Sequence, residues 1–196
     1  MEISVKSGSS GNIQTVDKNL RSHTQSLTFN ESIQSVQDGD AYNLNTGLIS
    51  FTGDGTFIYF KNDEDKTYVL EAIAVGLGSA ATHTDSAQIT LVRNPTGGDL
   101  ITDAAAVSMN KNRNFNSSKT LKTTTLVYKG KQGGTLTGGD ETALFFQGKG
   151  GRLYVTVNFI LKKGDSFGLK TLNKISSGTM PAYCALVGYF RDPENE

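Results

Sequence analysis

The tripeptide Gly164-Asp165-Ser166 is the stretch of this sequence whose residue types suit nucleophilic catalysis. A serine nucleophile needs a neighbouring base, because an unassisted hydroxyl is barely ionised at neutral pH. The chain has two histidines, His23 and His83, and both precede Ser166. The candidate nucleophile therefore has no histidine downstream of it to serve as the base.

The same tripeptide resembles the first block of the GDS-type hydrolases, which would imply esterase activity with Ser166 as the nucleophile. In that family the block follows the first strand of a parallel α/β sheet, and a C-terminal Asp-x-x-His supplies the base. Neither histidine of this chain lies in an Asp-x-x-His, and the pattern around Ser166 predicts antiparallel β structure rather than an α/β sheet. The alternative is a turn after a strand that ends at Leu161, in which Gly164 bends the chain and Asp165 caps it. We favour the turn and expect no enzymatic activity.

Cysteine and metal chemistry have few candidate residues. Cys184 lies in an apolar stretch, where a free cysteine is usually a small hydrophobic side chain. Two histidines so far apart in sequence do not make a zinc pattern. The acidic runs 38–40 and 62–65 offer hard oxygen ligands for calcium but lack EF-hand spacing, so solvated acidic turns are the alternative. We expect no cofactor and no metal.

Glycine-rich and aromatic residues suggest two further kinds of binding. The stretches 131–140 and 148–151 are rich in glycine but lack the P-loop order and a following helix, so they predict turns. Phe115, Tyr128 and Tyr154 are the aromatic candidates for stacking on a carbohydrate.

The charge balance argues against nucleic-acid and membrane-surface partners, since 19 basic and 19 acidic residues give a net charge of +0. The charges are nevertheless segregated along the chain. Residues 111–131 hold six basic residues and no acid, whereas residues 31–71 hold eight acids and two lysines. Such segments can pair between copies of the chain or with a charged scaffold, and the alternative is ordinary solvated loops.

Nothing in the sequence predicts export or a membrane span. The N-terminus has no apolar stretch of signal-peptide length, and no apolar run approaches the ~20 residues that cross a bilayer. The lone cysteine excludes an intrachain disulfide. We therefore expect a protein that is made in the cytoplasm of its host.

Short apolar runs separated by Gly, Thr, Ser and Asn predict an all-β domain over residues 37–196. About eight strands and no long helix favour a two-sheet antiparallel sandwich that is jelly-roll-like. One helical turn or two is expected within 102–110. Strands are expected at 48–51, 56–62, 67–78, within 87–101, and at 123–130, 142–148, 152–161, 166–172 and 181–190.

Three of these strands show which faces are buried. Residues 152–161 alternate, with apolar side chains on one face and Arg152, Tyr154, Thr156 and Asn158 on the other, which is free to face a partner. The run 56–60 is apolar on both faces, which predicts a central strand covered on both sides. The run 181–190 is also apolar on both faces.

Residues 1–36 differ from the rest, because their apolar residues are isolated and follow no sustained period. They predict an arm or extended leader that is ordered when it lies on another surface. A loosely packed first strand is the alternative. The apolar residues available for partner contact in this leader are Ile13, Val16, Leu20, Leu27 and Phe29.

Several stretches together resemble small virion structural proteins of tailed bacteriophages, especially marine ones. The stretches are Ile13–Ser26, Asp38–Gly76, Leu91–Ile101, Leu126–Asp140 and Phe159–Leu172. The resemblance covers most of the chain. It implies a β-sandwich without catalytic activity that assembles, often as a trimer, on the capsid or the tail.

From this resemblance we expect a homo-oligomer, with a trimer favoured, whose partners are the major capsid protein or other virion proteins. A capsid decoration or cement protein on the capsid surface is the leading hypothesis. The alternative is a β-sandwich module of a phage tail that binds a receptor or a carbohydrate.

Overall fold

The structure of the chain is a computed structural model. The regular structure is almost entirely β, and the one helix of the described residues is α1 (Glu31–Asp38). The predicted all-β class is confirmed. The residues that the structure describes are 3–7, 12–16, 22–26, 30–78, 87–99, 111–133, 135–147, 151–172 and 179–193.

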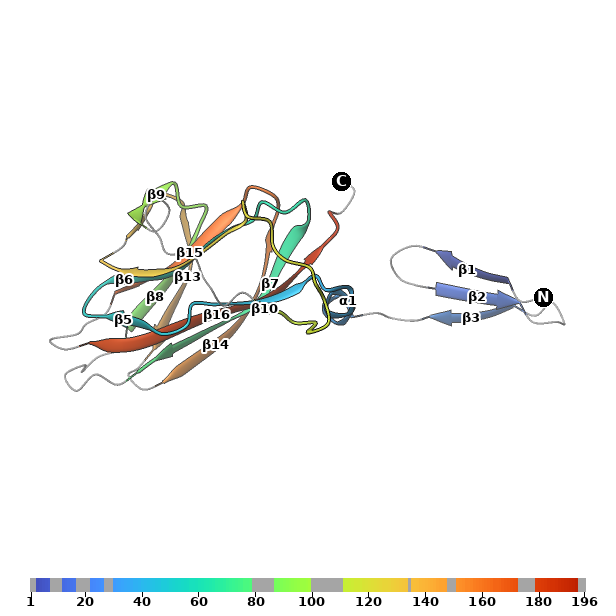
Figure 1. The fold of residues 1–196 in the computed structure, drawn as a ribbon, viewed down its shortest axis with the longest axis horizontal. Coiled ribbons are helices and arrows are strands. Elements are labelled where there is room, and N and C mark those ends of the chain that lie inside the picture. The colour runs from blue at the N-terminus through green and yellow to red at the C-terminus, as the bar shows by residue number, and fades with distance from the viewer. Residues whose placement is uncertain are drawn as a thin grey trace.

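Two antiparallel sheets form the body of the domain (Figure 1). The first, the β16 sheet, has the order β10 (Lys111–Asn112), β4 (Ala41–Asn45), β16 (Met180–Arg191), β7 (Thr67–Leu77) and β14 (Arg152–Leu161), and β5 (Ile49–Phe51) also pairs with β16. The second, the β15 sheet, has the order β11 (Leu126–Gln132), β6 (Gly55–Lys61), β15 (Ser166–Leu172), β8 (Ala87–Arg93) and β13 (Asp140–Gln147).

The strand pairing is that of a jelly roll, which agrees with the predicted jelly-roll-like sandwich, although the strand β4 was not among those expected from sequence. The eight main strands pair first with last and inward from there: β4 with β16, β6 with β15, β7 with β14, and β8 with β13. The limits of β14 and β15 are those expected from the sequence. The helical turn expected within 102–110 lies outside the described residues.

The core lies between the two sheets and is closed by aromatic and aliphatic side chains. Every residue of β6 from Gly55 to Phe60 is buried, so the prediction of a strand covered on both faces is confirmed. Its outer side is covered by Leu136, which lies in the small sheet of β9 (Gly97–Gly98) and β12 (Leu136–Thr137) and packs against Tyr59 and Val92. The largest fully buried side chains are Tyr68, Phe51, Phe57, Phe60, Leu44, Ile58, Leu70, Ile89, Leu169, Met180 and Leu186.

Helix α1 connects the leader with the sandwich. The Asn30 side chain caps its start by accepting a hydrogen bond from Ser32 N at 3.0 Å, and Gly39 ends it with φ of 75°. Val36 packs against Val69 and Tyr189 of the sandwich. The predicted limit of the leader at residue 36 therefore falls inside α1, which the polar composition of this stretch did not indicate.

The rest of the leader contains regular structure as well. Three short strands, β1 (Ile3–Ser7), β2 (Asn12–Val16) and β3 (Ser22–Ser26), pair with one another in a meander. This differs from the extended arm expected from the lack of apolar periodicity, because backbone pairing needs no apolar stripe.

The Tyr68 hydroxyl is a buried polar group that lacks a hydrogen-bond partner among the described residues. Tyr68 is 0% exposed between Phe60 and Phe190, with ring centroids 4.8 and 4.9 Å away. Burial raises the pKa of this phenol, and Glu71 raises it further, so the group stays neutral. A buried hydroxyl without a partner keeps its desolvation penalty.

We expect Tyr68→Phe to raise the free energy of unfolding by about 1 kcal/mol, because it removes the unsatisfied oxygen and keeps the ring. Urea unfolding followed by fluorescence measures the change. Tyr189→Phe is the matched control, since the Tyr189 hydroxyl donates to Glu31 Oε2 at 3.2 Å and its loss should not stabilise the protein. A clear loss of stability in Tyr68→Phe would contradict this interpretation.

Candidate functional site

The candidate site is the outer face of the β16 sheet, on the side away from the core. Along β16 the side chains of Ala182, Cys184 and Leu186 point into the core. The side chains of Tyr183, Ala185 and Val187 alternate with these core residues along the strand. They therefore lie on the outer face, where they are half-buried. A strand with apolar side chains on both faces therefore has one of its faces left partly open to solvent.

Strand register assembles these side chains into rows, because directly opposed residues of neighbouring strands project from the same face. The centre of the outer face is small and apolar, and its rim is polar, which is the composition of protein interfaces. The three rows are Tyr183, Gly76 and Arg152; Asn45, Ala185, Ala74 and Tyr154; and Asn43, Val187, Ala72 and Thr156.

Two tyrosines are the large side chains of this outer face. Tyr183 lies directly over Gly76, where a Cβ atom would fall 2.0 Å from Tyr183 Cε1. Glycine at position 76 thus lets the ring lie against the sheet and keeps the centre of the face flat. Tyr154 is 66% exposed on β14. Exposed or half-exposed tyrosines beside small residues are typical anchors of protein interfaces.

The size of the outer face limits what it can do alone. Four strands of about six residues each cover ~19 Å by ~20 Å, or ~380 Å², from standard strand spacing and rise. A stable interface buries ~800 Å² on each partner. The outer face is therefore about half of a standard interface, and a stable assembly through it needs a second contact.

β14 is an edge strand of the β16 sheet, and its predicted alternation of exposed and half-buried residues is observed. A bulge after Thr156 places Val157 and Asn158 opposite Glu71, and Asn158 has φ of 52°. Tyr154 and Thr156 thus lie together on the outer face. Asn158 is also exposed, and it lines a cavity of about 270 Å³ together with Leu91, Arg93, Thr142, Phe159, Ile160, Leu161 and Phe167.

The leader residues expected to contact a partner are only partly described. Ile13 and Val16 lie in β2, where they pair with Lys6 and Ile3 of β1. Leu20, Leu27 and Phe29 lie outside the described residues, as does His83. Partner contact by the leader stays a prediction.

The three aromatic candidates for carbohydrate stacking occupy different environments. Tyr128 is half-buried against Tyr59, with ring centroids 6.3 Å apart and planes 24° from parallel. Phe115 is 96% exposed. Its loop is held in place, since Asn114 Nδ2 donates to Gln37 O at 3.0 Å and Asn114 N donates to Asn112 Oδ1 at 2.9 Å. Phe115 and Tyr154 are therefore the accessible aromatic candidates, and Tyr128 supports the fold.

Gly164-Asp165-Ser166 has the geometry of the favoured turn. Gly164 has φ of 92°, and Asp165 Oδ2 accepts from Lys162 N at 3.0 Å. Ser166 is the first residue of β15, is 6% exposed, and donates its N–H to Asn94 Oδ1 at 2.7 Å. The serine belongs to the sheet, with its side chain turned away from solvent.

Cys184 is likewise part of the core. It is 0% exposed, and burial raises the pKa of its thiol, so the reactive thiolate is disfavoured. Its N–H donates to Thr46 Oγ1 at 2.9 Å. This is the environment of a small hydrophobic side chain.

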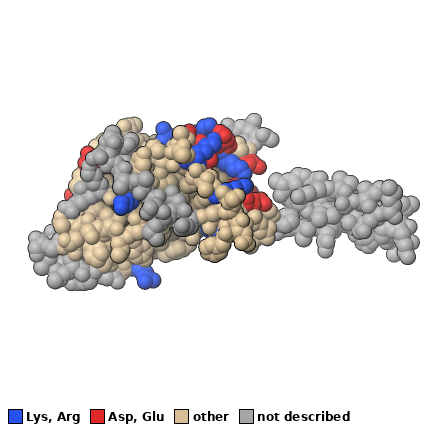
Figure 2. All heavy atoms as spheres, in the orientation of Figure 1, with Lys and Arg blue, Asp and Glu red and all other residues tan. Residues whose placement is uncertain are grey.

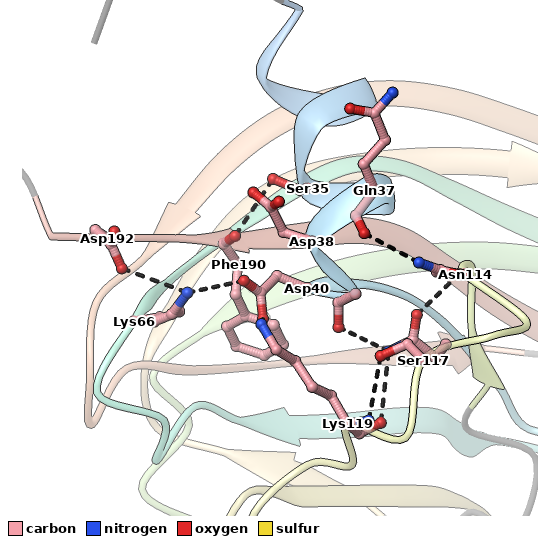
Figure 3. Close-up of polar contacts among 12 residues, drawn as sticks. Ser35, Gln37, Asp38, Asp40, Lys66, Asn114, Ser117, Lys119, Phe190 and Asp192 are labelled. Atoms are coloured by element: carbon pink, nitrogen blue, oxygen red, sulfur yellow. Dashed lines mark hydrogen bonds and ion pairs between the residues drawn. The ribbon is translucent and has the colours of Figure 1, made fainter. Parts of the chain in front are cut away.

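Both acidic runs considered for calcium form ion pairs with lysines, and Figure 3 shows the residues around Asp40. Asp40 lies between Lys66 at 2.8 Å and Lys119 at 2.9 Å. Asp65 lies 2.6 Å from both Lys122 and Lys163. Burial would raise the pKa of Asp40, but hydrogen bonds and charges from its two lysines outweigh burial and lower it. Hydrogen bonds from Lys122 and Lys163 lower the pKa of Asp65 to about 2.

The oppositely charged segments of the sequence therefore pair within the chain. Lys119 reaches Asp40, Lys122 reaches Asp65, and Arg113 Nη1 lies 3.3 Å from Glu71 Oε2. Figure 2 shows acidic and basic side chains interleaved at one end of the sandwich. These contacts fix residues 111–125 against the sandwich, which was not among the outcomes expected from sequence.

Comparison with known proteins gave no match, either to a family model or to a curated protein. No helix within the described part of the chain is long and apolar enough to span a bilayer.

The Asp40 network makes a prediction about pH. Because the folded-state pKa of Asp40 lies below its ordinary value of 3.8, the carboxylate stabilises the fold above that pH, and the stabilisation is lost as the pH falls through the lowered pKa. We expect Asp40→Asn to be less stable than the wild type at pH 7. The difference should shrink as the pH falls below 3.8.

Urea unfolding at pH 7, 4 and 3 measures this difference. Asp140→Asn is the matched control, because Asp140 is exposed at the start of β13 and is distant in sequence from the network. A gap between Asp40→Asn and wild type that is equal at every pH would show that Asp40 does not act through its charge.

Proposed function

We propose that this chain is a non-enzymatic structural protein of a phage virion that assembles as a homo-oligomer on the capsid, as a decoration or cement protein. The outer face of the β16 sheet is the observation that carries the assembly. A trimer is the favoured oligomer, and the major capsid protein is the favoured partner. The virion setting rests on the resemblance of the sequence stretches given above.

The physical argument for assembly is that the outer face of the β16 sheet carries apolar side chains that stay partly exposed to solvent. Ala74, Ala185 and Val187 are only partly buried, whereas farther along the sheet Val36 of α1 packs on Val69 and Tyr189. Covering the partly buried side chains with a second copy removes apolar surface from water, which is favourable by ~25 cal/mol per Å² before the cost of association.

The modest area of the outer face fits an assembly with many contacts. A face of ~380 Å² binds weakly by itself, but several weak contacts act together when copies are arrayed on one particle. In this proposal the leader, residues 1–36, supplies the additional contact along the shell or a neighbouring copy. Attachment is then mechanical, and it needs no catalytic or cofactor-binding residue.

We expect Ala74→Arg to abolish self-association while the chain remains folded. The side chain of residue 74 sits at the centre of the outer face, so a buried and unpaired guanidinium would oppose docking, whereas it stays solvated in the monomer. Sedimentation velocity of the full chain measures the oligomer. Thr124→Arg adds the same charge at an exposed turn and should leave the oligomer intact.

Capsid binding is measured with the same proteins and with particles that lack this chain. Wild type and Thr124→Arg should bind, and Ala74→Arg should bind far more weakly because avidity is lost. A wild-type protein that is monomeric at all concentrations and ignores such capsids would exclude the proposal.

A second candidate function is favoured by Phe115. An aromatic ring that is 96% exposed on a loop fixed by asparagine hydrogen bonds is arranged to contact something outside the chain. A carbohydrate-binding module of a phage tail would use such a ring to stack on a sugar.

We expect Phe115→Ala to change the free energy of unfolding by less than ~0.5 kcal/mol, as for other exposed residues. If the carbohydrate-binding function holds, the variant loses binding on a glycan array to which the wild type binds. Tyr128→Phe is the control and should keep binding, since Tyr128 stacks within the fold. Absence of wild-type binding to a broad array would remove this candidate.

A further inference from the structure

A cavity of about 400 Å³ lies at the end of the sandwich where β7 begins and where β14 and β16 end. Small-molecule sites commonly occupy ~300–1,000 Å³, so this cavity has the size of a ligand site. It is separate from the outer face, and it does not depend on the proposed assembly. Its walls are Asp65, Lys66, Thr67, Ile160, Lys162, Lys163, Arg191 and Pro193.

The lining of the cavity is strongly cationic. Four basic side chains face it against a single carboxylate, and they come from three separate parts of the chain: the start of β7, the turn after β14, and the end of β16. Adjacent lysines in a solvated turn are ordinary. Convergence of cations from separate elements on one cavity concentrates positive potential there.

The lining lysines Lys66 and Lys163 already have carboxylate partners, but each of those carboxylates is shared with a second lysine. Asp65 is shared by Lys122 and Lys163, and Asp40 is shared by Lys66 and Lys119, so two ammonium groups meet each carboxylate. Asp192 also lies 3.4 Å from Lys66, but its side chain is 86% exposed. Such an exposed ion pair contributes little, so an incoming anion can replace it.

Arg191 at the cavity wall pairs with Glu31 at 3.3 Å, on α1. This contact orients the guanidinium with a partner that is not itself part of the cavity wall. Arginine and lysine together are the side chains that proteins use for phosphate and sulfate groups, arginine as a planar donor and lysine as a point charge.

The remaining lining groups suit a hydroxyl-rich body attached to the anion. The ionised Asp65 carboxylate accepts hydrogen bonds from hydroxyls, and Thr67 contributes a hydroxyl of its own. Ile160 is 52% exposed at the cavity and offers an apolar wall. We propose that this cavity binds the phosphate or sulfate group of a modified sugar, with the sugar ring against Ile160.

The test titrates the full chain with glucose 6-phosphate, with glucose and with inorganic phosphate, and follows backbone amide NMR shifts. The expected result is saturable shifts with glucose 6-phosphate at Thr67, Ile160 and the Lys162–Lys163 turn. Glucose alone should give no saturable shift, and inorganic phosphate should bind at least tenfold more weakly than glucose 6-phosphate.

The matched variants separate this site from general charge attraction. Replacing both Lys162 and Lys163 with Gln should weaken glucose 6-phosphate binding at least tenfold and leave the thermal midpoint close to that of the wild type. Lys129→Gln, at an exposed position of β11 in the other sheet, should bind as the wild type does.

Three outcomes would overturn the proposal. No saturable shift with glucose 6-phosphate at tens of millimolar would exclude the site. Equal weakening by Lys129→Gln would show diffuse charge attraction. Inorganic phosphate binding as tightly as glucose 6-phosphate would overturn the sugar part of the proposal. A protein that is monomeric but still binds glucose 6-phosphate would contradict the assembly proposal and leave this one standing. The two proposals can therefore be tested separately.

Discussion

The constraint on which the rest of this structure depends is that β16 is apolar on both faces while the sandwich covers only one. The inner row, Ala182, Cys184 and Leu186, joins the core between the sheets. The outer face is covered at one end, where Val36 of α1 packs on Val69 and Tyr189 and where Ala72 is buried, while Tyr183, Ala185 and Val187 are only partly buried. A two-layer fold has no third layer to add, so the remaining surface either stays wet at a cost or is covered by another molecule.

The lysine–carboxylate network has a complementary role, because it fixes the segments that lie outside the sheets. Lys119 and Lys66 meet at Asp40, directly after α1, and Asn112 Nδ2 donates to Gly39 O at 2.7 Å. These contacts hold residues 111–125 and the C-terminal end of α1 together at one end of the sandwich (Figure 3). The oppositely charged segments of the sequence thus pair with each other within one chain. The centre of the outer face carries no charged side chain.

Much of the fold was predictable from sequence, because a half-buried β-strand shows apolar and polar residues that alternate with a period of two. The alternation of Arg152 to Leu161 located β14 with its limits, and the turn at Gly164 located β15. Helix α1 was missed, since eight residues are too few for an apolar period and only the caps Asn30 and Gly39 signal it. The small sheet β9–β12 was missed because two-residue strands rich in Gly and Thr have no apolar pattern.

The outer face was only half predictable for a related reason. Tyr154 and Thr156 were identified from one strand, but Ala74, Ala185 and Gly76 join them only through register, which sequence patterns do not specify. Asn158 shares their period and is exposed as they are, but it lies in the bulge and lines a second cavity. A one-residue insertion in a ladder is invisible to a period-two count.

The area of the outer face also bears on the symmetry of the proposed oligomer. A two-fold dimer through this face alone would bury ~760 Å² in total by strand spacing, below the ~1,000 Å² expected of a biological interface. A cyclic oligomer instead lets each copy use two different surfaces, one for each neighbour. In this proposal the second surface is the leader, residues 1–36, which would lie along a neighbouring copy. A ring would give each copy two buried surfaces, and the trimer we propose is the smallest such ring.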